Sequence, residues 1–114
     1  MSRKASGLKA WIVQRITAIY LAIVIVYLAV HFLSSPPTDY AAWRAWVSQP
    51  LISLGLLVFV PVLLAHAWVG LRDALMDYAR AFGVRMALLS LSAFVFLASG
   101  LWAVRAIILA GLEA

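Results

Sequence analysis

The residues of this chain that could carry chemistry gather in one stretch, 63–78, where an apolar segment ends in ionisable groups. Four of them are spaced by four, three and four positions and would share one face of a helix: His66, Gly70, Asp73 and Asp77. An imidazole can ligate a metal or a haem iron, and it can also pass protons to and from nearby carboxylates. The pattern therefore indicates either ligation or proton transfer on this face.

The composition places these ionisable groups in a membrane protein. Hydrophobic residues make up 67% of the 114 residues, charged residues make up 11%, and the mean hydropathy is +1.06. Soluble domains are about half apolar and a quarter charged. The net charge of +5 does not indicate nucleic-acid binding, because the basic residues lie beside apolar segments and form no separate patch. The chain has no cysteine, which excludes disulfides, thiolate metal sites and iron–sulfur ligation by this chain.

Three apolar segments reach the length of about 20 residues that crosses a bilayer, at about 11–33, 50–71 and 84–112. Pro36 and Pro37 end the first segment, and Gly83 is the expected turn residue before the third. Between the first two segments, aromatic residues recur at helical spacing, which is typical of a short helix in the headgroup region. We predict an all-α membrane protein, with three transmembrane helices and a short interfacial helix between the first two, forming a single anchor domain over 1–114.

Small residues also recur on the third segment and predict a face that another helix can approach closely: Ser99, Ala103, Ala106 and Ala110. Lysine and arginine concentrate before the first segment and within 72–85. The positive-inside rule therefore places the N-terminus and the 72–85 loop in the cytoplasm or matrix. The basic lead lacks the length and the repeated arginine and serine of a mitochondrial transit peptide, which favours a bacterial or an already processed chain.

Depth in the membrane then separates the two histidines. At about 1.5 Å of rise per residue, His66 lies roughly 9 Å and Arg15 roughly 6 Å from the inner ends of their segments, whereas His31 lies roughly 30 Å deep. One copy of the chain therefore cannot place both histidines on one haem iron. If His66 ligates haem, the other axial ligand comes from another subunit.

Each candidate residue also has an ordinary structural interpretation. The ring of His66 could simply hydrogen-bond a serine or a carbonyl on a neighbouring helix. Arg15 could bind an anion such as a haem propionate or a lipid phosphate, or it could extend to the interface. Tyr78 and Asp77 could hold a quinone, or they could be an interfacial tyrosine and a carboxylate paired with a nearby arginine. The spacing alone leaves these alternatives open.

The run from His66 to Tyr78, HAWVGLRDALMDY, resembles the signature of the smaller hydrophobic membrane anchor of bacterial succinate dehydrogenase (respiratory complex II). The stretch QRITA, residues 14–18, is similar to the opening of the first helix in that family. The number of spans and the aromatic segment after the first span also agree. The sequence departs from the family after Tyr78, where ARAF stands in place of a Val-Lys-Pro run.

The resemblance implies a haem b shared with a second hydrophobic anchor subunit of the cytochrome b type. His66 matches the haem-iron ligand, and Arg15 matches a basic residue near the haem propionates. Tyr78 matches the residue that hydrogen-bonds ubiquinone, and Asp77 lies beside it. An iron–sulfur subunit and a flavoprotein subunit would then deliver electrons from succinate, linking the tricarboxylic acid cycle to the respiratory chain.

The same resemblance implies a bacterial inner-membrane protein with a cytoplasmic N-terminus and no catalytic residue or stand-alone activity of its own. A rival hypothesis is a small proton-coupled transporter or channel subunit, in which His66, Asp73 and Asp77 form the proton path. A further alternative is a structural anchor without haem. The sequence has no Gly-rich phosphate loop, His-Glu-x-x-His motif or nucleophilic serine elbow, so nothing supports hydrolytic or phosphoryl-transfer chemistry.

Overall fold

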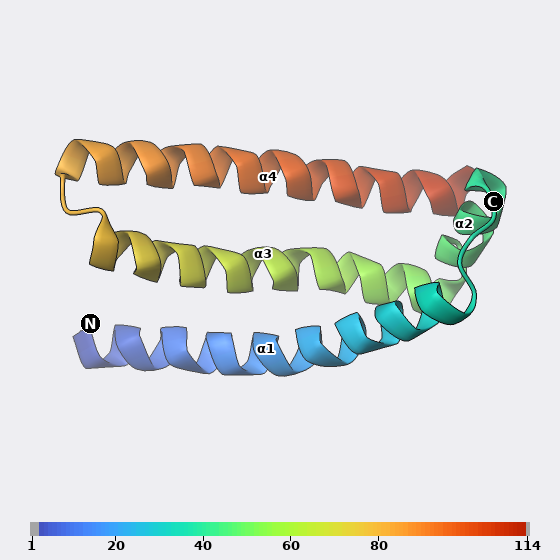
Figure 1. Cartoon of the computed structure of the whole chain (residues 1–114), viewed down its shortest axis with the longest axis horizontal. Helices are drawn as coiled ribbons and strands as arrows, with labels where there is room; N and C mark the ends of the chain where they lie inside the picture. Colours follow the sequence, from blue (N-terminus) through green and yellow to red (C-terminus); the bar gives the residue numbers. More distant parts are fainter. Residues whose placement is uncertain (1–2, 114) are drawn as a thin grey trace.

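The chain is entirely helical in the computed structural model, which describes residues 3–113 and the side chains of 7–112 (Figure 1). Four helices follow one another: α1 (Arg3–Ser34), α2 (Tyr40–Val47), α3 (Pro50–Tyr78) and α4 (Phe82–Glu113). Three segments are long and apolar enough to cross a membrane, namely Gly7–Ser34, Pro50–Tyr78 and Phe82–Leu112. The predicted fold class is confirmed, whereas the assignment of 1–114 to a single domain stays a prediction.

Local sequence explains where the first helices begin and end. α1 ends at Ser34, just before the two prolines, as predicted. Asp39 caps α2, because its carboxylate accepts a hydrogen bond from the Ala42 backbone N–H at 2.8 Å. α3 begins at Pro50, where a helix needs no backbone donor.

The turn between α3 and α4 differs from the prediction. The helix continues to Tyr78 although the apolar run ends near residue 71, and Gly83 lies inside α4. The turn is therefore residues 79–81, and no glycine among the described residues has a positive φ. Arg85 stabilises this turn, because its Nε donates to the Ala79 carbonyl at 3.0 Å. The prediction of Gly83 as the turn residue is wrong, since a turn of this conformation does not require glycine.

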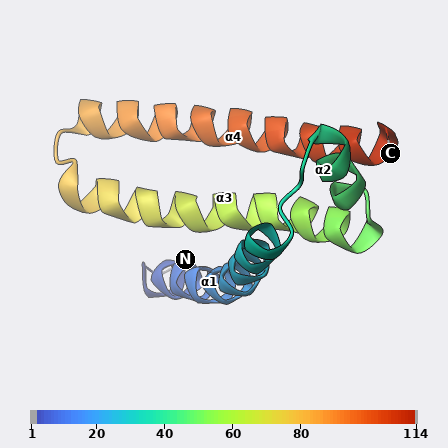
Figure 2. The same cartoon turned by 45° about the vertical axis from the view of Figure 1, so that its right-hand side comes forward.

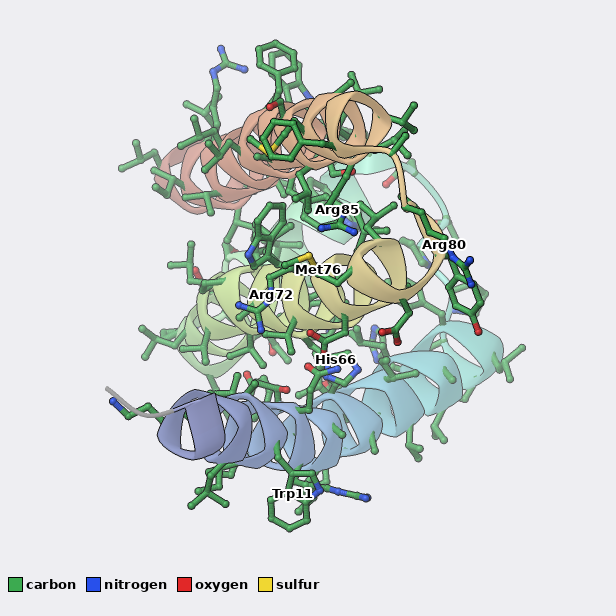
Figure 3. All side chains as sticks on the ribbon, turned by 90° about the vertical axis from the view of Figure 1, so that its left-hand side faces the viewer. Trp11, His66, Arg72, Met76, Arg80 and Arg85 are labelled. Carbon is green, nitrogen blue, oxygen red and sulfur yellow. The ribbon has the colours of Figure 1, made fainter. Side chains whose placement is uncertain are left out.

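The long helices lie in a row with α3 in the middle. α3 packs against both α1 and α4, whereas α1 and α4 make no contact within residues 3–113. Figure 3 shows this row nearly end on, and Figure 2 shows α1 running at an angle to the other two helices. The start of α1 and the α3–α4 turn lie at one end, and α2 lies at the other end beside the end of α4 (Figure 1). This arrangement agrees with a topology in which the N-terminus and the α3–α4 turn share one side of the membrane.

Tight packing is confined to few places, as expected of a row of helices. Val47 of α2 is fully buried against Ile107 and Ala110 of α4. Of the predicted small-residue stripe, Ala110 is buried, Ala103 and Ala106 are half-buried, and Ser99 is exposed. Gly100 makes the closest approach instead, because a Cβ atom at this position would collide with the Leu64 side chain of α3. The predicted stripe is therefore at least partly covered at Ala103, Ala106 and Ala110, whereas at its start Gly100 takes the place expected of Ser99.

Candidate functional site

His66 lies between α3 and α1 and is half-buried (Figure 3). Its Nδ1 atom is 3.0 Å from the hydroxyl oxygen of Thr17 on α1. The ring therefore contacts a polar group on a neighbouring helix, which is a threonine and not the serine or carbonyl considered as the structural alternative. No second hydrogen bond of this ring is found within the part of the chain that the structure describes. One ring nitrogen thus remains available to a ligand.

Beyond His66, two more residues of the predicted polar face of α3 also lie beside α1. A Cβ atom on Gly70 would lie 3.5 Å from the Gln14 side-chain nitrogen, so this glycine allows close approach. One turn further on, Arg72 and Asp73 join Gln14 in lining a cavity of about 370 Å³. The side-chain amide oxygen of Gln14, Oε1, is buried and has no hydrogen-bond partner among the described residues. Three of the four predicted face residues therefore point toward α1.

Arg15 lies on an exposed side of α1. Its guanidinium carbon is 5.3 Å from the centre of the Trp11 ring, a cation–π contact. Thr17, which contacts His66, is only two residues further along the helix, or about 3 Å along the axis. Arg15 and His66 therefore share a layer as predicted, but the structure shows no contact between their side chains.

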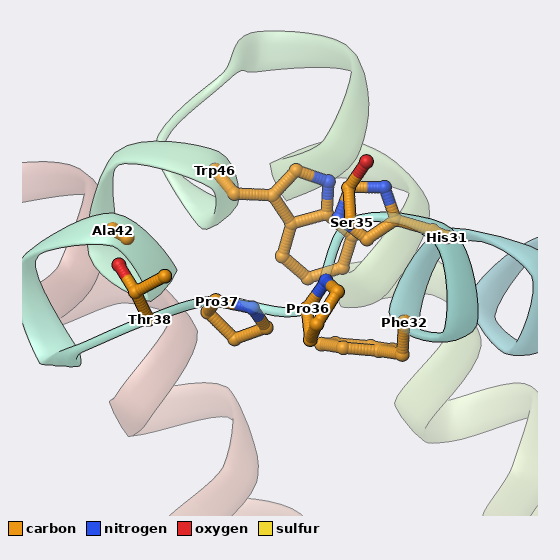
Figure 4. Close-up of a pocket in the computed structure, with 8 residues that line it drawn as sticks. All are labelled: His31, Phe32, Ser35, Pro36, Pro37, Thr38, Ala42 and Trp46. Carbon is orange, nitrogen blue, oxygen red and sulfur yellow. The ribbon is translucent and has the colours of Figure 1, made fainter.

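His31 occupies the opposite end of α1. Its ring stacks on Trp46 with the ring centres 4.6 Å apart, and it also packs against Tyr27 and Phe32. This aromatic cluster borders a cavity of about 180 Å³ beside Pro36 (Figure 4). Fourteen residues separate Thr17 from His31 on one continuous helix, a rise of about 20 Å. The prediction that one copy of the chain cannot bring both histidines together is confirmed.

Tyr78 and Asp77 end α3 and are exposed, Tyr78 to 85%. The ion pair found beside them joins Arg72 to Asp73 at 3.4 Å and does not include Asp77. These two residues therefore form a second polar feature, separated from His66 by about three turns of helix.

Sequence reasoning missed the α1 residues that face α3. Gln14, Thr17 and Tyr20 are spaced by three, and Tyr20 donates its hydroxyl proton to the Gly55 carbonyl at 3.0 Å. Polar side chains at this spacing in an apolar helix were the available signal, because each needs a partner inside a membrane.

A metal ion held by this chain alone is not supported. The described residues contain no cluster of three or more histidine, cysteine, aspartate or glutamate side chains. A haem makes a smaller demand, because the macrocycle itself supplies four of the iron ligands and the protein adds one nitrogen at each axial position. His66, with one ring nitrogen bonded and the other available, fits that demand.

These features define a multi-pass helical membrane protein with polar contacts between α1 and α3. The chain belongs to the succinate dehydrogenase/fumarate reductase transmembrane subunit family, whose model matches residues 1–107. A protein of Coxiella burnetii named succinate dehydrogenase hydrophobic membrane anchor subunit is 32% identical over 98 residues, which is 86% of this chain and 85% of the relative. A protein of Rickettsia felis with the same name is 30% identical over 86 residues, covering 75% and 72% of the two chains.

Proposed function

We propose that this chain is the hydrophobic anchor subunit of a succinate:ubiquinone oxidoreductase, and that it helps to bind haem b and to form the ubiquinone-reduction site. The observation that carries the proposal is the state of His66, which has one ring nitrogen held by Thr17 and the other without a bond in the described structure. Membership of the family supports the anchor role. No stand-alone activity is assigned to the chain.

The proposed haem would be held by His66 from this chain and by a histidine from the partner anchor, because His31 lies at the far end of α1. Bound haem would supply one-electron storage and transfer within the membrane. Ala67 and Gly70 are small neighbours of His66 along α3, and Gly70 lets the side chain of Gln14 on α1 approach closely. Arg15 would provide a positive charge for a propionate in the same layer.

The proposed ubiquinone site lies at the inner end of α3. Tyr78 would donate its hydroxyl proton to a quinone carbonyl, and Asp77 would hold or relay a proton beside it. The exposure of both side chains supports this proposal, because a site completed by partner subunits leaves its residues uncovered in the single chain.

The proposed assembly contains a second anchor of the cytochrome b type, an iron–sulfur subunit and a flavoprotein subunit. The two soluble subunits would dock on the cytoplasmic side of a bacterial inner membrane, where the N-terminus and the α3–α4 turn would lie. The arginines at this end support that orientation: Arg72, Arg80 and Arg85 (Figure 3).

The test is a mild-detergent purification of the tagged full-length chain from native membranes, with identification of the co-purifying proteins and a reduced-minus-oxidised spectrum of the same sample. The proposal predicts a flavoprotein, an iron–sulfur protein, a second anchor and a b-type haem. A sample with the partners but no haem would contradict haem binding. A chain without these partners that conducts protons in liposomes would establish the transporter hypothesis based on His66, Asp73 and Asp77.

A further inference from the structure

Thr17 makes a set of contacts that determines the tautomer of the His66 ring. Its hydroxyl oxygen is 2.6 Å from the Val13 carbonyl oxygen, 3.2 Å from the Gln14 carbonyl oxygen and 3.0 Å from His66 Nδ1. A hydroxyl has a single proton to donate and two lone pairs that accept. The position of that one proton therefore decides which ring nitrogen of His66 carries hydrogen.

The short distance to Val13 settles the position of the hydroxyl proton. Two oxygens 2.6 Å apart repel unless a proton lies between them, and this distance is typical of a strong O–H···O bond. A threonine within a helix commonly donates to the carbonyl four residues earlier. The Thr17 hydroxyl therefore donates to Val13 and must accept from His66, so that Nδ1 carries the ring proton.

We infer that Thr17 is a positioning residue for the proposed haem ligand: its hydroxyl accepts the Nδ1–H of His66, which holds the ring in the tautomer with a free Nε2 lone pair and fixes its rotation. The inference rests on the proposed function, because it concerns a ring nitrogen directed at iron. Metal-ligating histidines usually donate their second ring N–H to a fixed acceptor, which also raises the basicity of the ligating nitrogen. Here the acceptor is a neutral hydroxyl that is itself held by the α1 backbone.

Three variants of the assembled complex test this role. Thr17→Val keeps the shape of the side chain but removes the hydroxyl, Thr17→Ser keeps the hydroxyl, and Thr17→Ala deletes it without adding a methyl group beside the ring. The matched control is Ser34→Ala, because Ser34 on the same helix donates to the Val30 carbonyl at 2.7 Å and lies 3.4 Å from the His31 backbone carbonyl, but its hydroxyl bonds no histidine ring among the described residues. The readouts are the haem content per flavin and the midpoint potential of the haem.

We expect Thr17→Val and Thr17→Ala to weaken haem retention by about 10- to 100-fold and to move the midpoint potential to a more positive value. The potential rises because a ligand that loses its acceptor donates less electron density to ferric iron. Thr17→Ser should restore both readouts to near the wild-type values, and Ser34→Ala should leave them unchanged. A loss of packing alone would not produce rescue by serine together with a shifted potential.

His66→Ala, measured in the same series, distinguishes the positioning role of Thr17 from the assignment of His66 as the haem ligand. If His66→Ala loses the haem but both hydroxyl-deleting variants keep the wild-type haem content and potential, the positioning role is overturned and the ligand assignment stands. If His66→Ala keeps an unchanged haem, the ligand assignment itself fails. Should Thr17→Val fail to assemble, Thr17→Ala and Thr17→Ser alone decide the outcome, and equal behaviour of these two variants would overturn the role of the hydroxyl.

Discussion

The two faces of α3 contact their neighbouring helices in different ways. Toward α1 the contacts are polar: the His66 ring bonds the Thr17 hydroxyl, and Tyr20 donates to the Gly55 carbonyl. Toward α4 the contacts are apolar, with Leu64 packed against Gly100. The Trp68 and Phe96 rings also meet edge to face across this second seam, with their centres 6.3 Å apart. We refer to these as the polar seam and the apolar seam.

The difference between the two seams indicates which features of the molecule need a functional explanation. Close approach of small residues holds membrane helices together without polar groups, and the apolar seam demonstrates this in the same chain. Polar and ionisable side chains inside a membrane cost free energy unless they find partners. The polar seam carries that cost, and the side-chain Oε1 atom of Gln14 is buried without a partner in the described structure. We therefore interpret the apolar seam as the contact that holds the helices together, and the polar seam as the part of the chain that serves its proposed function.

The largest expected effect comes from breaking the apolar seam. Gly100→Val places a branched side chain against Leu64, and overpacking of this kind costs about 1–3 kcal/mol. We expect a lower thermal unfolding midpoint of the complex and an unchanged haem spectrum in the assembled fraction. Gly111→Val is the matched control, because a Cβ placed there would have no described atom within 4 Å apart from its chain neighbours and its own helix backbone. Loss of haem from an assembled Gly100→Val complex would show that the two seams are not independent.

The inner end of α3 gives the next effect. Tyr78→Phe removes one hydroxyl and leaves a fully apolar ring, and losing a hydrogen bond worth about 1.4 kcal/mol lowers the rate of ubiquinone reduction by about tenfold. Succinate oxidation with a soluble dye should remain normal, because the dye bypasses the quinone site. Tyr40→Phe in α2 is the control for an exposed tyrosine at the other end of the molecule. Normal rates with both acceptors would reduce Tyr78 to an interfacial residue.

Tyr20→Phe tests whether the hydrogen bonds of the polar seam act independently of one another. It removes the bond to the Gly55 carbonyl, and interhelical hydrogen bonds in membranes average about 0.6 kcal/mol. We expect a small fall in the unfolding midpoint and full haem content, because Tyr20 lies about one turn away from Thr17. Haem loss in this variant would mean that the contacts of the polar seam are coupled, so that haem binding at His66 depends on the Tyr20 hydrogen bond one turn away.

Arg15→Gln should have the smallest effect. Loss of a positive charge favours the oxidised haem, and the interaction is weak because the Arg15 side chain does not contact His66, so the ratio of reduced to oxidised haem at the wild-type midpoint should fall on the order of twofold. Arg105→Gln is closely matched, because Arg105 lies over the Trp102 ring at 5.2 Å on the other side of the molecule. Equal potentials in Arg15→Gln, Arg105→Gln and the wild type would place Arg15 outside the influence of the haem.

Much of the fold could be predicted because apolar length and proline positions directly determine membrane-spanning helices. The end of α3 could not, because hydropathy shows where a segment leaves the membrane and not where the helix stops. Residues 72–78 include the good helix formers Ala74, Leu75 and Met76, so the helix continues beyond the apolar run. The turn at 79–81 then depends on Arg85, a contact between residues six apart that no local pattern indicates.

The sequence predicted the α3 residues of the candidate site but not their partners on α1. The periodicity of α3 placed His66, Gly70 and Asp73 on one face, and the structure turns that face toward α1. The partner on α1 could not be chosen in advance, because depth arithmetic fixes the level of a residue but not the rotation of its helix. Arg15 and Thr17 occupy nearly the same level, and only the rotation of α1 brings Thr17 to the histidine.

The most direct measurement of the central claim compares His66→Ala with His31→Ala in the purified complex, using the reduced-minus-oxidised haem spectrum at equal flavin content. The account predicts that His66→Ala loses or strongly perturbs the haem absorption. His31→Ala should keep a wild-type spectrum, because its ring is held in an aromatic cluster at the far end of α1. An unchanged spectrum in His66→Ala, or haem loss only in His31→Ala, would contradict the assignment of the polar seam as the haem site.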